Sequence, residues 1–402
     1  MKKYMIFAAV AALTLASCAK VETISNTMEE ETPIGFSNYT PRSITKAGST
    51  YTSTADLPDN AVMGVYGYST ASGARFQGTE NPTFITNGMV DFGSSLGNSP
   101  TTTSGEKKYW PKDIRNLLTF YAYYPYAADN TGVITEKPTS TTSGLGNFHV
   151  AQTADVTTMV DFMISDVQND MYYWDGTNTS SNSYGRKSTT SGSTYGIVPL
   201  QLRHMLSNVN FYFKTNITET NTYIKIKEAS IAGIKSQAAV ALSYTAPTTA
   251  GDQGSTDFEV SAVTSSEYAS AITIPIASTI DTDNNTEPDT DVNYIKLTTT
   301  AAINYVDLAG TITKNNFLFV PQTLTDDAKV TIKYDLIQGE TSTENVVEVK
   351  IKGTANDANN AIVKWEYNNK YNYIFTIGLH EIYFTGDPVA WTNGDDANIT
   401  VN

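Results

Sequence analysis

The amino-acid sequence predicts an all-β protein with two tandem β-sandwich domains that divide near residue 195. Three observations support this fold class. No long stretch repeats its apolar residues at the 3.6-residue spacing of a helix. Short runs rich in Tyr, Thr, Val and Ile, which favour strands, recur along the chain. Stretches rich in Ser, Thr, Asn and Gly separate these runs and suit the turns of antiparallel sheets.

The first 18 residues have the pattern of an export signal. Two lysines, an apolar run over residues 5–15 and the sequence Leu-Ala-Ser-Cys follow one another. This order resembles a bacterial lipobox, in which the cysteine is lipidated and becomes the first residue of the mature chain. Cys18 is the only cysteine, and a free thiol would be a liability in an oxidising compartment. We expect a signal peptide over residues 1–17 and a lipid on Cys18; an ordinary signal peptide with a buried cysteine is the alternative.

Composition limits the partners. The chain has 402 residues, which suits two or three domains, and a net charge of −15. Nucleic acids and anionic lipids require clustered Lys and Arg, so this charge argues against both. No run after the signal reaches the ~20 apolar residues of a membrane-spanning helix.

The segment after the signal is expected to be a tether followed by a strand. Residues 19–32 contain few apolar side chains and resemble a disordered linker. Ile34 and Phe36 then alternate with small residues, which predicts a short strand. A Pro-Arg-Ser sequence around Arg42 ends it.

The first domain should contain several short strands around one apolar strand. Residues 117–125 form the most apolar stretch after the signal and should be the central strand. Residues 175–195 are a low-complexity loop. The other expected strands are 62–68, 84–85, 89–92 and 161–165.

The second domain has the clearest single strand. The odd positions of residues 371–379 are all large and apolar, so one face must be buried. A tail over 381–402 follows and is broken at 386–388. The other expected strands are 198–206, 209–214, 223–226, 231–234, 272–276, 294–297, 316–320, 330–336 and 346–351.

We expect no catalytic, cofactor or metal site. Residues 93–97 match the G-x-S-x-G spacing of a nucleophile elbow, but no helix can follow them. His149, His204 and His380 share no metal-ligand spacing, and His204 is expected to be structural. The acidic loop 281–291 lacks the glycine and final glutamate of a calcium loop; a weak calcium site there stays open.

Several motifs together resemble the fimbrillin family, the subunits of type V pili. They are Cys18 and residues 109–111, 120–125, 161–163, 202–206 and 372–373. The resemblance implies two transthyretin-like β-sandwich domains, residues 43–195 and 196–402. It also implies export as a lipoprotein to the outer membrane and assembly into surface fimbriae.

The resemblance further implies proteolytic processing. A trypsin-like protease would cut after Arg42, or after Lys46 as second choice, and remove residues 18–42 with Ile34 and Phe36. A sandwich that loses a strand exposes an apolar groove and unpaired backbone groups. A plain exposed arginine at position 42 is the alternative.

A second subunit would then donate a strand to the groove, through main-chain hydrogen bonds and alternate side chains. The family pattern places this donor in the C-terminal tail, residues 385–402. Its apolar positions are Val389, Trp391, Ala397, Ile399 and Val401. An ordinary edge strand of the chain's own domain is the alternative.

The function expected is therefore a structural or adhesive pilus subunit, not an enzyme. Its partners would be other pilin subunits, the membrane lipid before processing, and a host or bacterial surface ligand. The resemblance leaves stalk, tip and anchor roles open. A lipid-anchored glycan-binding sandwich that uses aromatic residues such as 172–174 is the runner-up, and a secreted hydrolase is a distant third.

Overall fold

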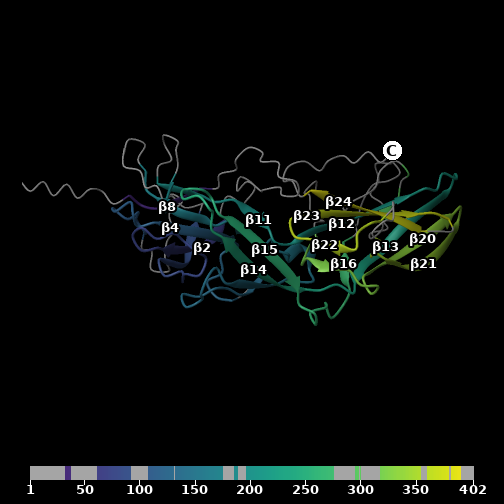
Figure 1. Cartoon of the computed structure of the whole chain (residues 1–402). Coiled ribbons are helices and arrows are strands. Elements are labelled where there is room, and N and C mark those ends of the chain that lie inside the picture. Colours follow the sequence, from purple (N-terminus) through teal and green to yellow (C-terminus); the bar gives the residue numbers. More distant parts are fainter. Residues whose placement is uncertain are drawn as a thin grey trace, which may run out of the picture.

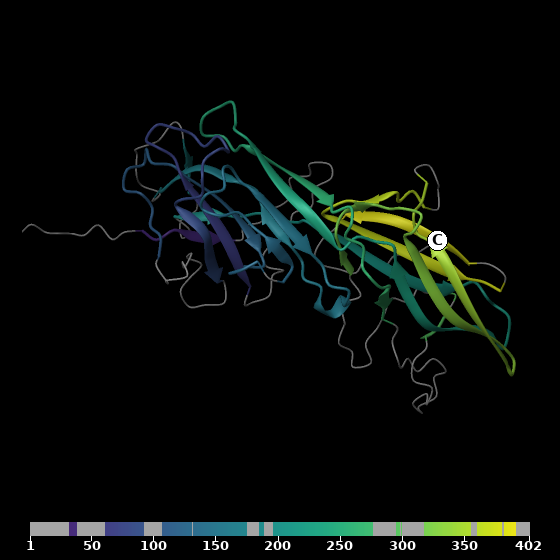
Figure 2. The same cartoon turned by 90° about the horizontal axis from the view of Figure 1, so that it is seen from below.

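The computed structural model describes residues 32–37, 61–91, 107–130, 132–174, 185–188, 196–275, 295–297, 299, 317–354, 360–379 and 382–390. Strands make up nearly all of the regular structure there. One 3-10 turn, η2 (Val156–Thr158), is the only helical element in these ranges. The molecule is elongated, with β2, β4 and β8 towards one end and β20 and β21 at the other (Figures 1 and 2). The predicted all-β sandwich class is confirmed.

The N-terminal half is built on a seven-stranded sheet of main order β11-β7-β4-β2-β3. β4 is central because it pairs with β2, β7 and β8, and six of its seven residues are buried. The prediction of a central strand in this apolar stretch is thus confirmed. The strands of this sheet are β2 (Val62–Ser69), β3 (Ile85–Asp91), β4 (Leu118–Tyr124), β7 (Met163–Ser165), β8 (Gln168–Tyr172), β9 (Arg186–Lys187) and β11 (Leu202–His204).

A four-stranded sheet of order β15-β14-β6-β5 packs against this sheet. Tyr66 and Tyr121 of the first sheet stack with their ring centroids 5.1 Å apart, and Phe148 of β6 meets Tyr66 at 6.3 Å. Val240 of β14 and Phe258 of β15 belong to the same buried cluster. The strands are β5 (Ile134–Glu136), β6 (Asn147–Ala151), β14 (Gln237–Thr245) and β15 (Ser255–Ala262).

This second sheet crosses the predicted domain boundary near residue 195. β14 pairs with β6 in antiparallel register, with Gln237 opposite Ala151. The β14–β15 hairpin therefore completes the core of the N-terminal half, although it comes from the later part of the chain. The division into residues 43–195 and 196–402 stays a prediction.

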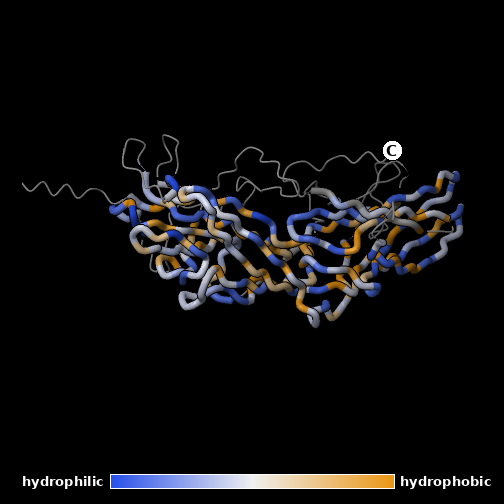
Figure 3. Tube along the Cα trace, viewed as in Figure 1, coloured by the Kyte–Doolittle hydropathy of each residue, from blue (hydrophilic) through white to orange (hydrophobic). Residues whose placement is uncertain are grey.

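The C-terminal half contains two further four-stranded paths, β18-β12-β23-β24 and β16-β13-β20-β21, with β17 also on β13. They enclose one apolar cluster that includes Phe211, Ile332 and Phe375. Apolar and polar residues alternate along these strands (Figure 3). Bounds are β12 (Ser207–Thr215), β13 (Thr222–Ala232), β16 (Ile272–Ile274), β17 (Ile295–Lys296), β18 (Phe317–Phe319), β20 (Lys329–Gln338), β21 (Thr341–Lys350), β23 (Asn369–Ile377) and β24 (Ile382–Ala390). A separate pair is β19 (Gln322–Thr323) with β22 (Lys364–Trp365).

Several strand predictions need correction. Residues 84–85 and 89–92, expected as two strands, belong to one strand, β3. Residues 198–206, expected as one strand, contribute to two, β10 (Ile197–Pro199) and β11, and the expected loop 175–195 contains β9. The two strands expected within residues 223–234 are one strand, β13, which a β-bulge near Lys227 bends without ending. The break expected at 386–388 is wrong, because β24 continues through it, paired to β23. The strands β5, β6, β8, β14 and β15 were not expected from the sequence.

No helix in the described part of the chain has the length and apolar character needed to cross a bilayer.

Candidate functional site

The N-terminal strand β1 (Gly35–Ser37) pairs in parallel with β10 (Ile197–Pro199). Gly35 lies opposite Ile197. A strand was expected here from the spacing of Ile34 and Phe36, and the structure has one. One edge of β1 is therefore paired with β10, a strand whose first residue lies 162 positions after Gly35 in the sequence.

The other edge of this segment is also hydrogen-bonded. The Ile34 N–H donates to the carbonyl of Lys108 at 2.9 Å. The Trp110 N–H donates to the carbonyl of Thr32 at 3.0 Å. Residues 32–37 thus lie between β10 and residues 108–110, an arrangement that we call the N-terminal strand slot.

The slot is apolar. Ile34 and Phe36 are both fully buried. Phe36 meets Phe120 edge to face, with ring centroids 5.4 Å apart and an interplanar angle of 84°. The rest of the cluster is Met63, Val65, Ile85, Val90, Trp110, Leu118, Ala122, Met163, Met171, Val198, Leu200 and Leu202.

One carbonyl oxygen of the slot, just before β10, accepts two hydrogen bonds. The carbonyl oxygen of Gly196 accepts the indole N–H of Trp110 at 2.8 Å and the backbone N–H of Gly35 at 3.2 Å. Gly196 has φ +79°, which favours glycine, and a Cβ there would lie 3.2 Å from Trp110 Nε1. Glycine therefore lets the indole approach the β1 backbone closely.

The one predicted donor residue that the structure describes, Val389, lies in β24. β24 is the outer strand of its sheet and pairs antiparallel with β23, where Val389 lies opposite Lys370. Its residues 385–390 are thus edge-strand residues of this chain's own sheet. The structure does not bring Val389 to the N-terminal strand slot. The remaining tail positions, Trp391, Ala397, Ile399 and Val401, lie outside the described residues.

Other predicted positions also lie outside the described residues. They are Cys18, Arg42 and Lys46, the serine-containing loop 93–97 and the acidic loop 281–291. Among the residues that the structure does describe, no group of three or more His, Cys, Asp or Glu side chains could hold a metal ion.

His204 is a structural residue in its surroundings, as expected. It is 3% exposed, and its Nδ1 lies 2.5 Å from Oδ2 of Asp161. Its neighbour Arg203 donates from Nη2 to Oδ2 of Asp166 at 2.9 Å. Burial raises the pKa of Asp166, and the Arg203 guanidinium opposes that rise.

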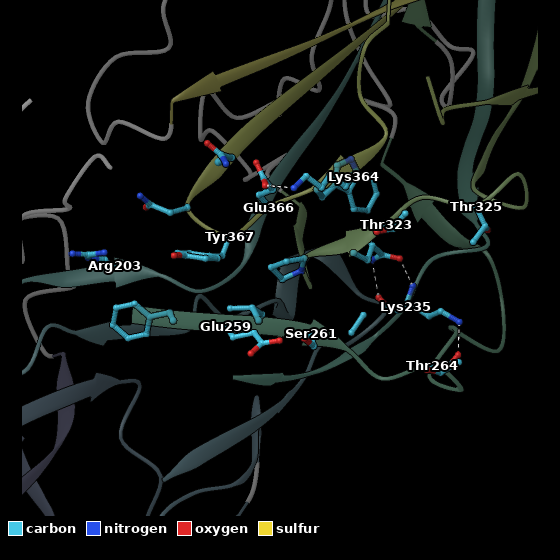
Figure 4. Close-up of a pocket in the computed structure, with 18 residues that line it drawn as sticks. Arg203, Lys235, Glu259, Ser261, Thr264, Thr323, Thr325, Lys364, Glu366 and Tyr367 are labelled. Carbon is cyan, nitrogen blue, oxygen red and sulfur yellow. Dashed lines mark hydrogen bonds and ion pairs between the residues drawn. The ribbon is translucent and has the colours of Figure 1, made fainter. Parts of the chain in front are cut away.

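A cleft lies between β15 and the turn that joins β22 to β23. This cleft has a volume of about 810 Å³. In Figure 4, Glu259 and Ser261 of β15 lie on one wall, and Lys364, Glu366 and Tyr367 lie on the other. The remaining lining residues are Arg203, Lys235, Phe258, Val260, Ala262, Thr264, Pro321, Gln322, Thr323, Thr325, Trp365, Asn368 and Asn369.

The charged groups of the cleft are mostly paired. Lys235 contacts Glu267, Lys364 Nζ lies 2.5 Å from Glu366, and Arg203 binds Asp166. The Arg203 guanidinium also stacks over Phe258, 5.5 Å from its ring centroid. Burial raises the pKa of Tyr367, whose ring meets Phe258 at 6.4 Å.

Sequence reasoning missed this cleft because it missed β15. The signal was present: Thr256, Phe258, Val260 and Ala262 alternate with Ser255, Asp257, Glu259 and Ser261. It also missed the role of Gly196, which carries no sequence signal apart from being a glycine beside an apolar run.

One solved structure is similar enough to this chain to support the fold. A fimbrial protein from Bacteroides vulgatus is similar in structure, with a TM-score of 0.56 and 18% sequence identity, over 90% of this chain and 99% of that chain. A candidate cell adhesion protein from Bacteroides uniformis gives a TM-score of 0.45 and 13% identity over 90% of this chain and 99% of that one. No curated protein matches.

A comparison with sequence families identifies the family of this chain, whereas the solved structures support the fold alone. The sequence pattern described as "Fimbrillin-like" matches residues 45–287, which is more than half of the chain. The chain therefore belongs to the fimbrillin-like family.

Proposed function

We propose that this protein is a stalk or tip subunit of cell-surface fimbriae that becomes able to polymerise when its N-terminal strand is removed. Family membership supports the fimbrial and adhesive role. In this proposal the chain is exported as a lipoprotein on Cys18 and cut after Arg42, or after Lys46 as second choice. Residues 18–42 then leave with Ile34 and Phe36.

The observation that carries the proposal is the N-terminal strand slot. Two fully buried side chains, Ile34 and Phe36, lie in residues 32–37, a segment that is hydrogen-bonded on both edges. A cut after Arg42 would leave that strand attached to the rest only through non-covalent contacts. Its loss would expose the apolar cluster and the free backbone of β10 and residues 108–110.

A strand from another subunit can fill such a vacancy. Main-chain hydrogen bonds would supply affinity, and alternate apolar side chains would enter the positions of Ile34 and Phe36. The tail after β24 is the proposed donor. Ala397, Ile399 and Val401 alternate with polar residues there. Trp391 just after β24, and Val389 at its end, would add to the contact only if the last residues of β24 left β23.

The first test is processing. A folded Cys18→Ser precursor should give one product beginning at Ser43 when it is treated with a trypsin-like protease, as read by mass spectrometry. Arg42→Ala should block that product, and the matched variant Lys46→Ala should not. A product that begins elsewhere, or no shortened chain, would contradict the assignment of Arg42.

The second test is assembly. Electron microscopy should show fibres from the processed chain, and deletion of residues 397–402 should prevent fibres while circular dichroism shows an unchanged fold. Asn398→Ala, which changes a polar position of the alternating sequence, is the control that should still polymerise. Fibres of normal length from the deletion variant would reject the tail as donor. An uncleaved chain that binds glycans without forming fibres would favour the lipid-anchored glycan-binding alternative.

A further inference from the structure

The strand β21 has one edge that no other strand covers in the described part of the chain. It is the outer strand of the path β16-β13-β20-β21, and β20 is its only strand partner among these residues. The β20–β21 ladder runs from Lys329 opposite Lys350 to Gln338 opposite Thr341 without a register shift. The hairpin lies at the end of the molecule opposite β2, β4 and β8 (Figures 1 and 2). A long, regular edge of this kind, without proline or bulge, is a template for the addition of another strand.

The hydrogen-bond pattern shows which backbone groups of β21 lie on the open edge. The Ile351 N–H, just after β21, donates to the carbonyl of Ala328, just before β20, at 3.0 Å. In an antiparallel pair, the groups of successive residues point alternately towards and away from the partner strand. The N–H and C=O groups of the even-numbered residues in 342–350 therefore point away from β20. Among the described residues, no backbone hydrogen bond outside the strand ladders reaches Glu344, Val346 or Glu348.

The same strand carries an exposed apolar side chain. Val346 is 63% exposed, more than any other large apolar residue in the described structure. On the opposite face of the strand, Val347 and Val349 are partly buried and pack against the core of the C-terminal half. A strand added beside β21 would shield these valines and extend that core sideways.

The charges of β21 are complementary to a second copy of the same strand. Glu344 and Lys350 share a face of the sheet, because strand residues separated by an even number of positions point the same way. When two copies pair antiparallel with Val347 opposite Val347, Glu344 of each copy lies opposite Lys350 of the other. Opposite charges in such cross-strand pairs stabilise a sheet. This register also aligns the even-numbered residues of both copies, whose backbone groups are the ones available for hydrogen bonds.

The neighbouring registers lack this complementarity. A shift by one residue aligns even-numbered with odd-numbered residues, so the outward backbone groups of the two copies do not meet. A shift by two residues places Glu344 opposite Glu348 in one direction and Glu348 opposite Glu348 in the other, and like charges directly opposite are destabilising. A shift by four residues removes the two Glu344–Lys350 pairs. The charge pattern thus favours one register.

We infer that β21 is a self-association edge, through which two copies of this chain pair antiparallel with Val347 on the two-fold axis. Each interface then contains two Glu344–Lys350 pairs, as the symmetry of an isologous contact requires. The sheets of the two copies become one continuous sheet. This contact uses neither the N-terminal strand slot nor the C-terminal tail, so it goes beyond the proposed function and does not depend on it.

The charged side chains of the pair are accessible for this contact. The Glu344 side chain is 51% exposed, although its carboxylate lies 3.2 Å from Lys227 Nζ and 3.5 Å from Lys333 Nζ. The Lys350 side chain is 60% exposed, and its contact with Asp326 is long, at 3.9 Å. Both can therefore accept a partner from a second copy without breaking a buried interaction.

Disulfide trapping tests the register in the unprocessed chain, with Cys18→Ser as background. A residue on the two-fold axis faces its own copy, so Val347→Cys alone should give an intermolecular disulfide at a rate that rises with protein concentration. Val347 would form a non-hydrogen-bonded pair, in which the Cα atoms are about 4.5 Å apart and within reach of a disulfide.

The matched control is Val349→Cys, on the same face of the same strand. Its two copies would be four residues out of register, about 13 Å apart along the strand, and should stay reduced. A mixture of Val349→Cys and Asn345→Cys chains should form the mixed disulfide, because the register places these positions opposite each other. Equal rates for Val347→Cys and Val349→Cys would overturn the pairing, and faster cross-linking of Val346→Cys than of Val347→Cys would overturn the register.

Charge variants test the same contact without an added cysteine, with sedimentation equilibrium as the measurement and circular dichroism as the check of folding. Glu344→Lys should weaken dimerisation about tenfold, because two attractive cross-strand pairs become repulsive at once. Glu344→Lys combined with Lys350→Glu should restore dimerisation, since the exchanged charges again lie opposite one another. Glu340→Lys makes the same charge change in the hairpin turn, outside the paired residues, and should have no effect.

Two results of the charge experiment would overturn the inference. One is a natural β21 sequence that stays monomeric at every concentration, and the other is a folded double variant that does not regain dimerisation. The unprocessed chain keeps β1 in its slot, so neither result bears on strand exchange. Conversely, a processed chain that fails to form fibres leaves the β21 contact untouched.

Discussion

The ring of Phe36 packs edge to face on the ring of Phe120, with 5.4 Å between centroids. One ring belongs to the N-terminal strand and the other to the central strand β4 of the main sheet. This geometry is favourable for aromatic pairs beyond the apolar area that they bury. The first strand of the described chain is therefore anchored directly in the core of the N-terminal half.

Phe36→Ala should lower the free energy of unfolding of the unprocessed chain by about 3–5 kcal/mol, the usual cost of deleting a buried phenylalanine ring. Urea denaturation measures the change. Val346→Ala is the matched control: Val346 is 63% exposed, so its truncation should cost less than about 0.5 kcal/mol. Equal costs for the two variants would show that β1 contributes no more than a surface residue.

A pH dependence is expected from Asp170. Its Oδ1 accepts the Phe76 N–H at 2.7 Å, and Arg75 Nε lies 3.9 Å from its Oδ2. Burial nevertheless raises the pKa of Asp170 above the ordinary 3.8. The folded state then binds its proton more readily than the unfolded chain, so its contribution to stability falls as pH rises above about 4.

Asp170→Asn should therefore gain stability relative to the natural chain as pH rises from about 4 to 7. Thermal unfolding at a series of pH values measures that difference. Asp113→Asn is the control: hydrogen bonding to Arg115 lowers the pKa of Asp113 to about 2, so its relative stability should stay constant from about pH 4 to 7 and change only below about pH 4, with the opposite sign. A relative stability of the Asp170 variant that does not change with pH would refute the expectation.

Buried tyrosines predict sensitivity to alkali. Tyr66, Tyr68 and Tyr121 donate their hydroxyls to the carbonyls of Pro138, Gly144 and Leu145 at 2.8, 3.1 and 2.7 Å. Burial raises the pKa of each of these tyrosines well above the ordinary value of 10. The folded state holds the proton more tightly, so stability should fall as pH rises above 10.

Absorbance at 295 nm should show that these tyrosines ionise only when the chain unfolds. Tyr121→Phe should cost about 1–3 kcal/mol at neutral pH, because the Leu145 carbonyl loses its buried donor. Tyr109→Phe, at a residue that is 38% exposed, should cost little. Full titration of every tyrosine in the native protein near pH 10 would contradict the burial of this cluster.

Local patterns in the sequence were enough to predict several strands and their buried faces. The alternation in residues 371–379 placed Tyr371, Tyr373 and Phe375 on a buried face, and the structure puts all three in the C-terminal core. The apolar run at β4 likewise became the centre of its sheet. These predictions held because the two-residue period of a strand decides which side chains face the core.

Which strands pair with one another was decided by the tertiary structure. Nothing near Gln237 in the sequence indicates that β14 pairs with β6, and nothing near Ile197 indicates that β10 pairs with β1. The run through Gly386 and Pro388 read as a break, yet its backbone continues as β24 on an outer edge. A proline is tolerated there because an edge strand leaves one row of N–H groups unpaired.

The sequence by itself determined the class of fold, the lipobox resemblance of Cys18 and the apolar character of Ile34 and Phe36. Only the tertiary structure decided that those two side chains enter a slot between β10 and residues 108–110, and that β15 is the outer strand of its sheet, beside a cleft. The physical reason is that backbone hydrogen bonds are chemically the same for every residue. Side-chain alternation therefore fixes the buried face, whereas strand partners are selected by packing across the whole core.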